Sequence, residues 1–587
     1  MESSNPPRWL VCAWIVAYLA IELFGRDFWK PDEPYSFGMT LNMILGQHWI
    51  VPHVGNTAFV EKPPLLYWTG AVAALAFDGW ATPQVAVQGV TLGWMLLTLW
   101  GLSRCATCYG GRRLALPAIA AFLGIVGGIT HIHKTTADVP QLTGAVFALD
   151  GSMLAARTGV SPIRAGLWLG TGGGIAFLAK GLMIPATMAL AVVLLFLTRS
   201  KAMNRQRSRL WRVLVWAAGT CAPWVMIWPV LLWLEAPDQF HEWFWRDNVG
   251  RFTGHGNVGE LRASYWRDAG VLFALSMPVF AWMLGMVVRR VKRLALRPPM
   301  CSSERDAESR YAHARRYGCL VRITKWWHAI SDARCVVLIY VISVTILLLG
   351  AASIRELYLL PLYPAFALIA ARLASIPIRS AGKRLGLAVS IGVVGGYGWL
   401  QWGLLVWAPE HVLPWGVSAW LPVNDFSLPF QPFAFAVAIL VTGLWGWILF
   451  RGRSMSRAWV WLANVTLIWG ILHTLLLPWL DAARGYRVTF VSLREALPSD
   501  VACLDTIGVG ESERAMLHYW VGVVPTIANG AGPSEPTCSH LLIMDKHGRD
   551  REAPPFVSGN PLWQGSRQAD RNERFRLFET VRLKPRL

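Results

Sequence analysis

Long apolar runs alternate with short polar segments along most of the chain. Thirteen runs are apolar enough to form the core of a membrane-spanning helix, which needs about 20 mostly apolar residues. These runs are 9–24, 83–102, 114–129, 139–155, 165–178, 182–197, 213–234, 271–288, 336–349, 357–371, 385–407, 433–450 and 458–477. One further run, 65–77, is too short to cross the hydrocarbon, so we expect a half-embedded helix there, within a first outer loop at 25–82.

The pattern changes from residue 481 onward. The tail is polar, and the strand-like segments VACLDTIGV and HLLIMD flank the helix-like ESERAMLHYW. We therefore expect an all-α polytopic membrane protein with a small C-terminal α/β domain, divided into residues 1–480 and 481–587. In the membrane part, GTGGGIAF lies inside a span and predicts close helix packing, not phosphate binding.

Composition supports the membrane class. Hydrophobic residues make up 54% of the chain and charged residues 15%, and the mean hydropathy is +0.39. A soluble domain of this length would have nowhere to place so much apolar surface. The net charge of +20 is typical of basic cytoplasmic loops, so nucleic acid is not indicated as a partner.

Loop charge gives the spans a direction. Six basic loops fall on one side when thirteen spans are counted, at 104–113, 157–164, 201–209, 289–334, 372–384 and 451–457. Basic loops stay in the cytoplasm. We therefore expect the N-terminus inside and the C-terminal domain outside, in the periplasm of a bacterial inner membrane.

The cysteines are scattered. Cys105 and Cys108 have no second pair nearby, so the sequence does not favour a zinc or redox site there. In the tail, Cys503 and Cys538 either form a disulfide in an oxidising compartment or remain as two buried thiols.

Ionisable residues gather on the outer side of the predicted bundle. They are Asp32, Glu33, Glu61, Lys62, Asp138, Lys180, Arg251, His255 and Arg355. Any one of them could simply anchor a helix at the interface. As a set with both signs of charge, they are better explained as a site for a phosphate-bearing amphiphile, with cations on the phosphate and carboxylates handling protons or a metal. No nucleotide-binding motif occurs in the sequence, so a nucleotide cofactor is not expected.

Several of these residues lie in motifs. In chain order, DEPYSFGM, HWIVPHVGN, FVEKPPLLYW, AKGLMIP, DNVGRFTGH and RELYLLPLYPAFAL resemble the bacterial aminoarabinose transferase group, within the protein O-mannosyltransferase superfamily of the GT-C fold. The resemblance covers most of the membrane portion. It implies an inverting glycosyltransferase that moves a sugar from a polyprenyl-phosphate donor, such as undecaprenyl phosphate, to an envelope lipid or glycan such as lipid A.

The resemblance also implies roles for individual residues. Asp32 matches the acidic residue expected to orient or deprotonate the acceptor, and Lys62 matches the lysine on the donor phosphate. Further substrate-binding or phosphate-proximal positions correspond to Glu33, Asp138, Lys180, Arg251 and Arg355. Glu61 and His255 match positions that can hold a divalent metal, zinc above all, although a zinc site usually has three or four ligands.

The sequence departs from the family at one position. Where relatives have an arginine before the tyrosine of the first motif, this chain has Pro34 before Tyr35. The sugar and the acceptor are therefore left open. Two alternatives also stay open: a flippase for lipid-linked sugars, which should have repeats and paired broken helices, and a scaffold, in which Asp32 would be replaceable.

Overall fold

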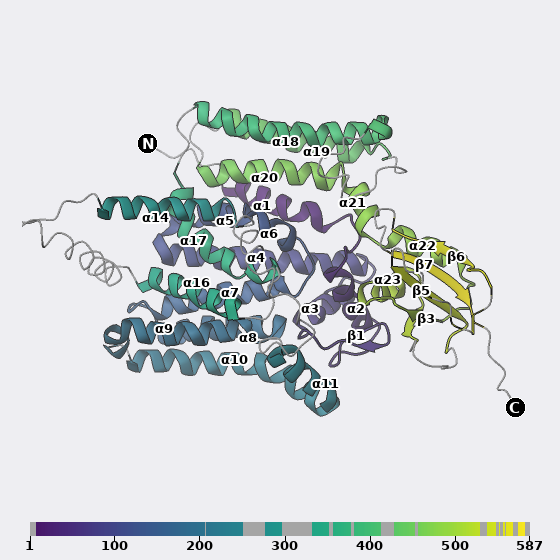
Figure 1. The fold of residues 1–587 in the computed structure, drawn as a ribbon. Helices are drawn as coiled ribbons and strands as arrows, with labels where there is room; N and C mark the ends of the chain where they lie inside the picture. The colour runs from purple at the N-terminus through teal and green to yellow at the C-terminus, as the bar shows by residue number, and fades with distance from the viewer. Residues whose placement is uncertain are drawn as a thin grey trace, which may run out of the picture.

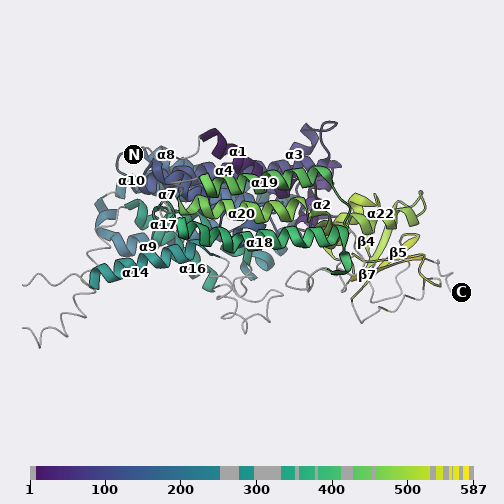
Figure 2. The same ribbon diagram turned by 90° about the horizontal axis from the view of Figure 1, so that it is seen from above.

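The computed structural model describes residues 8–205, 207–250, 276–295, 332–350, 356–376, 381–411, 428–451, 456–528, 537–546, 551, 554, 556–557, 559–567 and 573–580. Within these residues, a bundle of long helices runs in one general direction and a β-sheet unit lies against one of its ends (Figure 1). The view from above shows the same arrangement, with the sheet beyond the ends of the helices (Figure 2).

The bundle contains the helices expected from the apolar runs. They are α1 (Arg8–Leu23), α4 (Pro83–Gly110), α5 (Ala115–Leu123), α6 (Val126–Ile132), α7 (Asp138–Ala155), α8 (Pro162–Lys180), α9 (Met183–Arg205), α10 (Arg207–Glu235), α14 (Val279–Ala295), α16 (Asp332–Gly350), α17 (Leu362–Ala374), α18 (Ala381–Trp407), α19 (Pro432–Arg451) and α20 (Arg457–Thr474). By length and composition, three of the described helices can cross a membrane, or five when two bent pairs each count as one span. The number thirteen remains a prediction.

One predicted span is not continuous. The run 114–129 forms a short 3-10 turn, η1 (Arg112–Leu114), and then α5 and α6, which meet at an angle of 82°. Ile125 between them is extended, and the backbone groups freed by the break find other partners. Trp461 Nε1 donates to the Gly124 carbonyl at 2.7 Å, and Val126 N donates to the Met277 carbonyl at 3.0 Å. These bonds satisfy groups that a straight helix would have paired internally.

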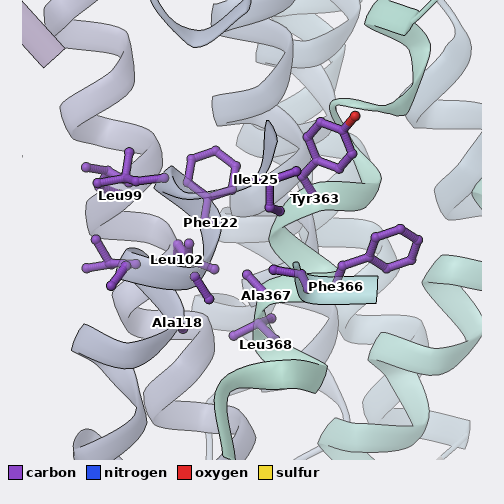
Figure 3. Packing of buried hydrophobic residues seen from close by; sticks show 14 of the residues in the cluster. Leu99, Leu102, Ala118, Phe122, Ile125, Tyr363, Phe366, Ala367 and Leu368 are labelled. Atoms are coloured by element: carbon purple, nitrogen blue, oxygen red, sulfur yellow. The ribbon is translucent and has the colours of Figure 1, made fainter. Parts of the chain in front are cut away.

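The core of the bundle lies where α4, α5 and α17 meet. Leu99 and Leu102 of α4, Phe122 of α5, and Tyr363 and Phe366 of α17 are all buried and pack in one cluster (Figure 3). This cluster fixes the positions of α4, α5 and α17 relative to one another.

The glycine-rich segment of α8 allows unusually close packing, as predicted. A Cβ on Gly172 would lie 2.2 Å from the backbone nitrogen of Ala148 in α7, and one on Gly170 would lie 2.2 Å from the Ala217 carbonyl of α10. Backbones can approach this closely only where no side chain intervenes.

Shorter elements cover the end of the bundle nearest the sheet. They are α2 (Asp32–Ile44), the hairpin β1 (His53–Val54) and β2 (Thr57–Ala58), α3 (Leu65–Ala76), α11 (Pro237–His241), the π-helix η2 (Glu242–Val249), η4 (Glu356–Leu359), η5 (Pro409–His411), α21 (Leu477–Arg484) and α22 (Arg487–Ala496). The helix predicted at 65–77 is α3. Its outer surface exposes Val72, Leu75 and Phe77, and Trp80 just beyond it is 91% exposed, as expected of a helix seated in a lipid interface.

The tail folds into a five-stranded mixed sheet with the order β4-β3-β5-β7-β6. Its elements are β3 (Cys503–Ile507), α23 (Glu511–Trp520), β4 (Val524–Ile527), β5 (His540–Lys546), β6 (Trp563–Gly565) and β7 (Glu573–Glu579). Strand β3 pairs in parallel with both β4 and β5, whereas β7 pairs antiparallel with β5 and β6. Of the two alternatives for the tail cysteines, the structure has the disulfide between Cys503 and Cys538.

The sheet unit, residues 501–580, is joined closely to the bundle through α2. A Cβ on Gly38 of α2 would lie 2.6 Å from the Cβ of Ala515 in α23, so the two helices touch along their backbones. The carboxylate of Asp27 accepts hydrogen bonds from the backbone nitrogens of Tyr486 and Arg487 at 2.9 and 3.0 Å. The start of α2 is thus held between the two parts of the molecule.

Candidate functional site

The first feature of the site is a contact between Asp32 and Lys62 through one tyrosine. Asp32 is the first residue of α2, and the hydroxyl of Tyr35, one turn later, donates to its Oδ1 at 2.8 Å. Lys62, in the loop before α3, donates to the same hydroxyl, and its Nζ lies 4.7 Å from the centre of the Tyr35 ring. The structure therefore brings together the two residues that the motifs assigned to acid–base work and to phosphate binding.

The surroundings keep Lys62 charged. Burial alone would lower its pKa, but the negative charges of Glu61, Asp32 and Asp138, together with Tyr67, raise the pKa overall. Burial, and then the Asp32 and Glu61 carboxylates, raise the pKa of the Tyr35 hydroxyl well above its usual value, so it stays protonated. A fixed ammonium held in partly desolvated surroundings can stabilise the charge that develops on a phosphate leaving group.

Asp32 and Tyr35 open onto a cavity of about 670 Å³. Phe59 and Glu61 line the same wall, and the opposite wall belongs to the sheet unit. Asp32 is half-buried, so its carboxylate is reachable from the cavity while the helix end keeps it oriented. This arrangement suits a base that takes a proton from a bound acceptor.

Asp138 and Lys180 form a second charged pair beside the first. Asp138 begins α7, Lys180 ends α8, and their side chains form an ion pair. The Lys180 ammonium also lies 5.0 Å from the ring centre of Tyr358 in η4. Asp138 acts electrostatically on Lys62, so the two pairs lie near each other, and their membership of one outer-facing site stays a prediction.

Glu33 has a different environment from its neighbour Asp32. Its side chain is fully buried. The Arg26 guanidinium donates two hydrogen bonds to the carboxylate, from Nη1 to Oε2 at 2.7 Å and from Nη2 to Oε1 at 2.8 Å. Backbone nitrogens of Trp29 and Thr135 donate to the same carboxylate at 3.1 and 2.8 Å. Burial alone would lower the pKa of Arg26, but Glu33 raises it overall. This geometry gives no support to substrate binding by Glu33; instead it ties α2 to the segment before α7.

Three of the predicted site residues, Arg251, His255 and Arg355, lie outside the described residues. Glu61, the other residue predicted to hold a metal, lines the cavity beside Asp32. Among the residues that the structure describes, no group of three or more His, Cys, Asp or Glu side chains could hold a metal ion.

Sequence reasoning missed three contributors. Tyr35 stands three residues after Asp32, a spacing that places both on one face of a helix, so the pattern could have identified it. Arg26 lies seven residues before Glu33, and nothing in that spacing indicates a buried pair. Lys30 pairs with Glu513 at 2.5 Å and also with Glu573, both from the sheet unit, and no local signal could have joined residues so distant in sequence.

The comparisons with known proteins agree with the motifs. No protein-family model matches the chain. The undecaprenyl phosphate-alpha-4-amino-4-deoxy-L-arabinose arabinosyl transferase 2 of Proteus mirabilis is 25% identical over 299 residues, which cover 50% of this chain and 51% of the relative. Transferase 1 of Pseudomonas fluorescens is 26% identical over 291 residues, 46% of this chain and 47% of the relative. The matched region thus spans about half the length of these curated relatives.

The solved structures extend the likeness over the whole fold. The crystal structure of ArnT from Cupriavidus metallidurans bound to undecaprenyl phosphate matches with a TM-score of 0.64 and 16% identity, over 98% of this chain and 99% of that one. Its apo state matches with a TM-score of 0.63. The chain therefore has the fold of a solved ArnT, and the resemblance of its motifs to aminoarabinose transferases is confirmed in sequence over about half of the curated relatives' length.

Proposed function

We propose that this protein is an inverting glycosyltransferase that moves a sugar from a polyprenyl-phosphate donor, undecaprenyl phosphate above all, to an envelope lipid or glycan. The observation that carries the proposal is the Asp32–Tyr35–Lys62 contact, in which Asp32 and Tyr35 line a cavity and the buried Lys62 contacts Tyr35. A carboxylate and a buried ammonium that both contact one tyrosine hydroxyl provide a general base and a positive charge for the leaving phosphate within one site. The likeness to a structure bound to undecaprenyl phosphate supports the donor class.

In the proposed reaction each residue has one task. The Lys62 ammonium holds the donor phosphate and neutralises the charge that grows as the bond from the anomeric carbon to the phosphate oxygen breaks. Asp32 accepts the proton of the acceptor group that attacks the same carbon from the opposite side. The Tyr35 hydroxyl contacts both side chains and holds them in fixed positions relative to each other. The Asp138–Lys180 pair adds a second ammonium near the phosphate.

The proposed setting is a bacterial inner membrane with thirteen spans, the N-terminus in the cytoplasm and residues 481–587 in the periplasm. The disulfide between Cys503 and Cys538 supports the placement of the tail, because disulfides persist in oxidising compartments. Alkaline phosphatase fused after residue 587 should be active, and one fused after residue 380 should be inactive. The opposite pattern would reverse the topology.

A divalent metal at Glu61 and His255 is also proposed from the family resemblance, and no step above is routed through it. Zinc binding by the purified chain, measured by metal analysis, should fall when Glu61 is replaced by Gln. An unchanged zinc content would remove the metal from the proposal. The flippase alternative gains no support from the relatives described above, which are named as transferases.

The test is transfer of a labelled sugar from synthetic undecaprenyl-phosphate sugars to envelope lipids by the purified protein. Asp32→Asn should reduce turnover by ~10²–10⁴-fold, the usual contribution of a general base. Asp78→Asn is the matched control, because Asp78 is an exposed aspartate in the same outer loop. Equal turnover by Asp32→Asn and Asp78→Asn would overturn the mechanism.

A further inference from the structure

A second cavity, of about 570 Å³, lies inside the helix bundle. Its described lining residues come from α7, α8, α9, α10 and α16, and it runs between α9 and α10. None of these lining residues also lines the cavity beside Asp32. We call this space the lateral cavity, and the proposed transfer does not use it.

The lateral cavity exists because α9 and α10 pack on different partners. Ala191 of α9 packs with Cys335 of α16, whereas Val213 of α10 packs with Ala165 of α8. The two consecutive helices therefore make few contacts with each other. Ala189, which lines the lateral cavity from α9, is exposed, so the cavity opens at the surface of the bundle.

The walls of the lateral cavity are apolar. Most of the described lining residues are alanine, leucine or valine. The hydroxyls of Ser152 and Tyr340 already have acceptors, because they donate to the carbonyls of Ala148 at 2.8 Å and Pro361 at 3.0 Å. A polar ligand would lose its hydrogen bonds to water on entering such a space, so the walls favour a hydrocarbon chain.

The lateral cavity is about as long as one leaflet of a membrane is deep. Its lining follows α10 from Arg209 to Cys221. This stretch is about 18 Å long, because a helix rises about 1.5 Å per residue. Half of the hydrocarbon core of a bilayer is about 15 Å thick. Since α10 is one of the described helices that can cross a membrane, the length fits one acyl chain from one leaflet.

The charged residues of the lateral cavity lie at one end. Among the described lining residues these are Arg209, near the start of α10, and Asp332, the first residue of α16. Arg209 Nη2 donates to the carbonyl of Arg157 at 2.6 Å, which fixes the guanidinium at this end. Arg212, one turn later in α10, lies close enough to act electrostatically on Arg209. Two arginines face one aspartate here, so this end favours an anionic group.

The start of α10 continues this basic character at the surface. Arg207 and Arg212 are exposed, and Trp211 between them is 59% exposed. Arginine and tryptophan at the end of a membrane helix are typical of the head-group level. Basic pockets between membrane helices bind anionic lipid head groups. The apolar walls and the basic end therefore match the two parts of one lipid.

We propose that the lateral cavity binds one acyl chain of an anionic phospholipid, and that Arg209 and Arg212 attract its phosphate head group. The lipid comes from the leaflet on the side of the basic loops. It fills the space between α9 and α10. Because it binds the folded chain, added lipid should also raise the melting temperature.

Lipid binding is measured by native mass spectrometry on the purified full chain in detergent. The probes are phosphatidylglycerol, phosphatidylethanolamine with the same acyl chains, and undecaprenyl phosphate. We expect phosphatidylglycerol to bind about 10-fold more tightly than phosphatidylethanolamine. Equal binding of these two lipids would overturn the role given to the arginines.

Two pairs of variants locate the bound lipid. Ala189→Phe places a large side chain in the lateral cavity and should weaken phosphatidylglycerol binding at least 10-fold. Ala222→Phe, at an exposed alanine of α10 outside the described lining, should leave it unchanged. Arg212→Gln should weaken it about fivefold, the usual contribution of one basic residue near an anionic surface. Arg113→Gln, at an exposed arginine of another basic loop, should not.

Equal binding by Ala189→Phe and Ala222→Phe would overturn the proposal. Arg212 is exposed, so Arg212→Gln keeps the test decisive even where Ala189→Phe fails to fold. Displacement of phosphatidylglycerol by an equal amount of undecaprenyl phosphate would assign the lateral cavity to a polyprenyl chain instead. These outcomes leave the transferase proposal untouched, because turnover of Asp32→Asn tests it separately.

Discussion

Two charge clusters lie on either side of the start of α2, and they differ in how deeply their carboxylates are buried. In the closed cluster, Arg26 and two backbone nitrogens saturate the fully buried carboxylate of Glu33. In the open cluster, Asp32 and Lys62 both contact the Tyr35 hydroxyl, and Asp32 and Tyr35 line a cavity. Two acidic residues adjacent in sequence therefore have opposite surroundings, because successive helix positions point about 100° apart.

This difference indicates which carboxylate stabilises the fold and which one can take part in the reaction. A buried carboxylate whose acceptor sites are filled can hold two segments together but has no capacity left for a substrate. A half-buried carboxylate beside a cavity keeps a face for a ligand. We infer that Glu33 positions α2 and that Asp32 acts on what the cavity holds, and the following changes probe that division.

The largest expected effect is on the closed cluster. Glu33→Gln keeps the shape of the side chain but leaves the Arg26 guanidinium buried without its counter-charge, and breaking such a pair costs about 3–5 kcal/mol. The melting temperature of the purified protein should therefore fall sharply. Glu242→Gln, which breaks the exposed pair with Arg246, should change it little. If both variants melt alike, the closed cluster is not what holds α2.

The next effect concerns donor binding in the open cluster. Lys62→Met keeps the length of the side chain and removes its charge, so undecaprenyl phosphate should bind about 100-fold more weakly, a typical loss for a charge-assisted bond. Arg246→Met serves as the control for removing an outer cation. Native mass spectrometry or tryptophan quenching would measure the affinity. Undiminished binding to Lys62→Met would place the donor phosphate elsewhere.

A smaller effect is expected from the residue that joins the open cluster. Tyr35→Phe removes only the hydroxyl between Asp32 and Lys62, which corresponds to about 1.5 kcal/mol and so to a roughly 10-fold lower kcat. The aromatic packing against Phe59, with ring centres 5.2 Å apart, should be retained. Steady-state transfer kinetics would measure the change. A shift in melting temperature as large as that of Glu33→Gln would assign Tyr35 to the closed cluster instead.

The smallest expected effect is a pH dependence at the junction with the tail. Burial, and then the nearby Asp481 carboxylate, raise the pKa of Asp27 from its ordinary value of 3.8 to about 6. The folded state therefore holds this proton more tightly than the unfolded chain, and the stability it gains below pH ~4 is lost as pH rises through about 6. Asp481→Asn keeps an oxygen for the bonds from Asp27 N and Trp29 Nε1.

That substitution removes the neighbouring charge and should lower the pKa of Asp27. The loss of stability between pH 4.5 and 7 should then be smaller by about 1 kcal/mol, the equivalent of less than one pKa unit. Melting curves of the two proteins across this range would measure the difference. Parallel pH profiles would mean that Asp27 does not titrate there.

Much of this structure was predictable from the sequence, for identifiable reasons. Helices such as α7 and α18 follow from long apolar runs, and β3, α23 and β5 lie in the tail segments predicted as strand and helix. The bend at Gly124 was not predictable, because it depends on Trp461, more than 300 residues away, taking the freed carbonyl.

The sequence predicted which residues lie at the candidate site, but not which of them face the cavity and which are buried in ion pairs. Charge pattern and motifs both pointed to Asp32 and Lys62, and the structure joins them through Tyr35. Glu33 was grouped with them because its burial depends on Arg26 and on the backbone of Thr135, neither of which the local pattern reveals. The second wall of the cavity depends on tertiary contacts with the tail, which no local signal encodes.

The backbone contact between Gly38 and Ala515 has a consequence for how such proteins can diversify. A tail grafted from a relative would collide with α2 or leave a gap unless both helices were exchanged together. The exchangeable module is therefore the tail with residues 25–62, which would carry its reactive aspartate with it.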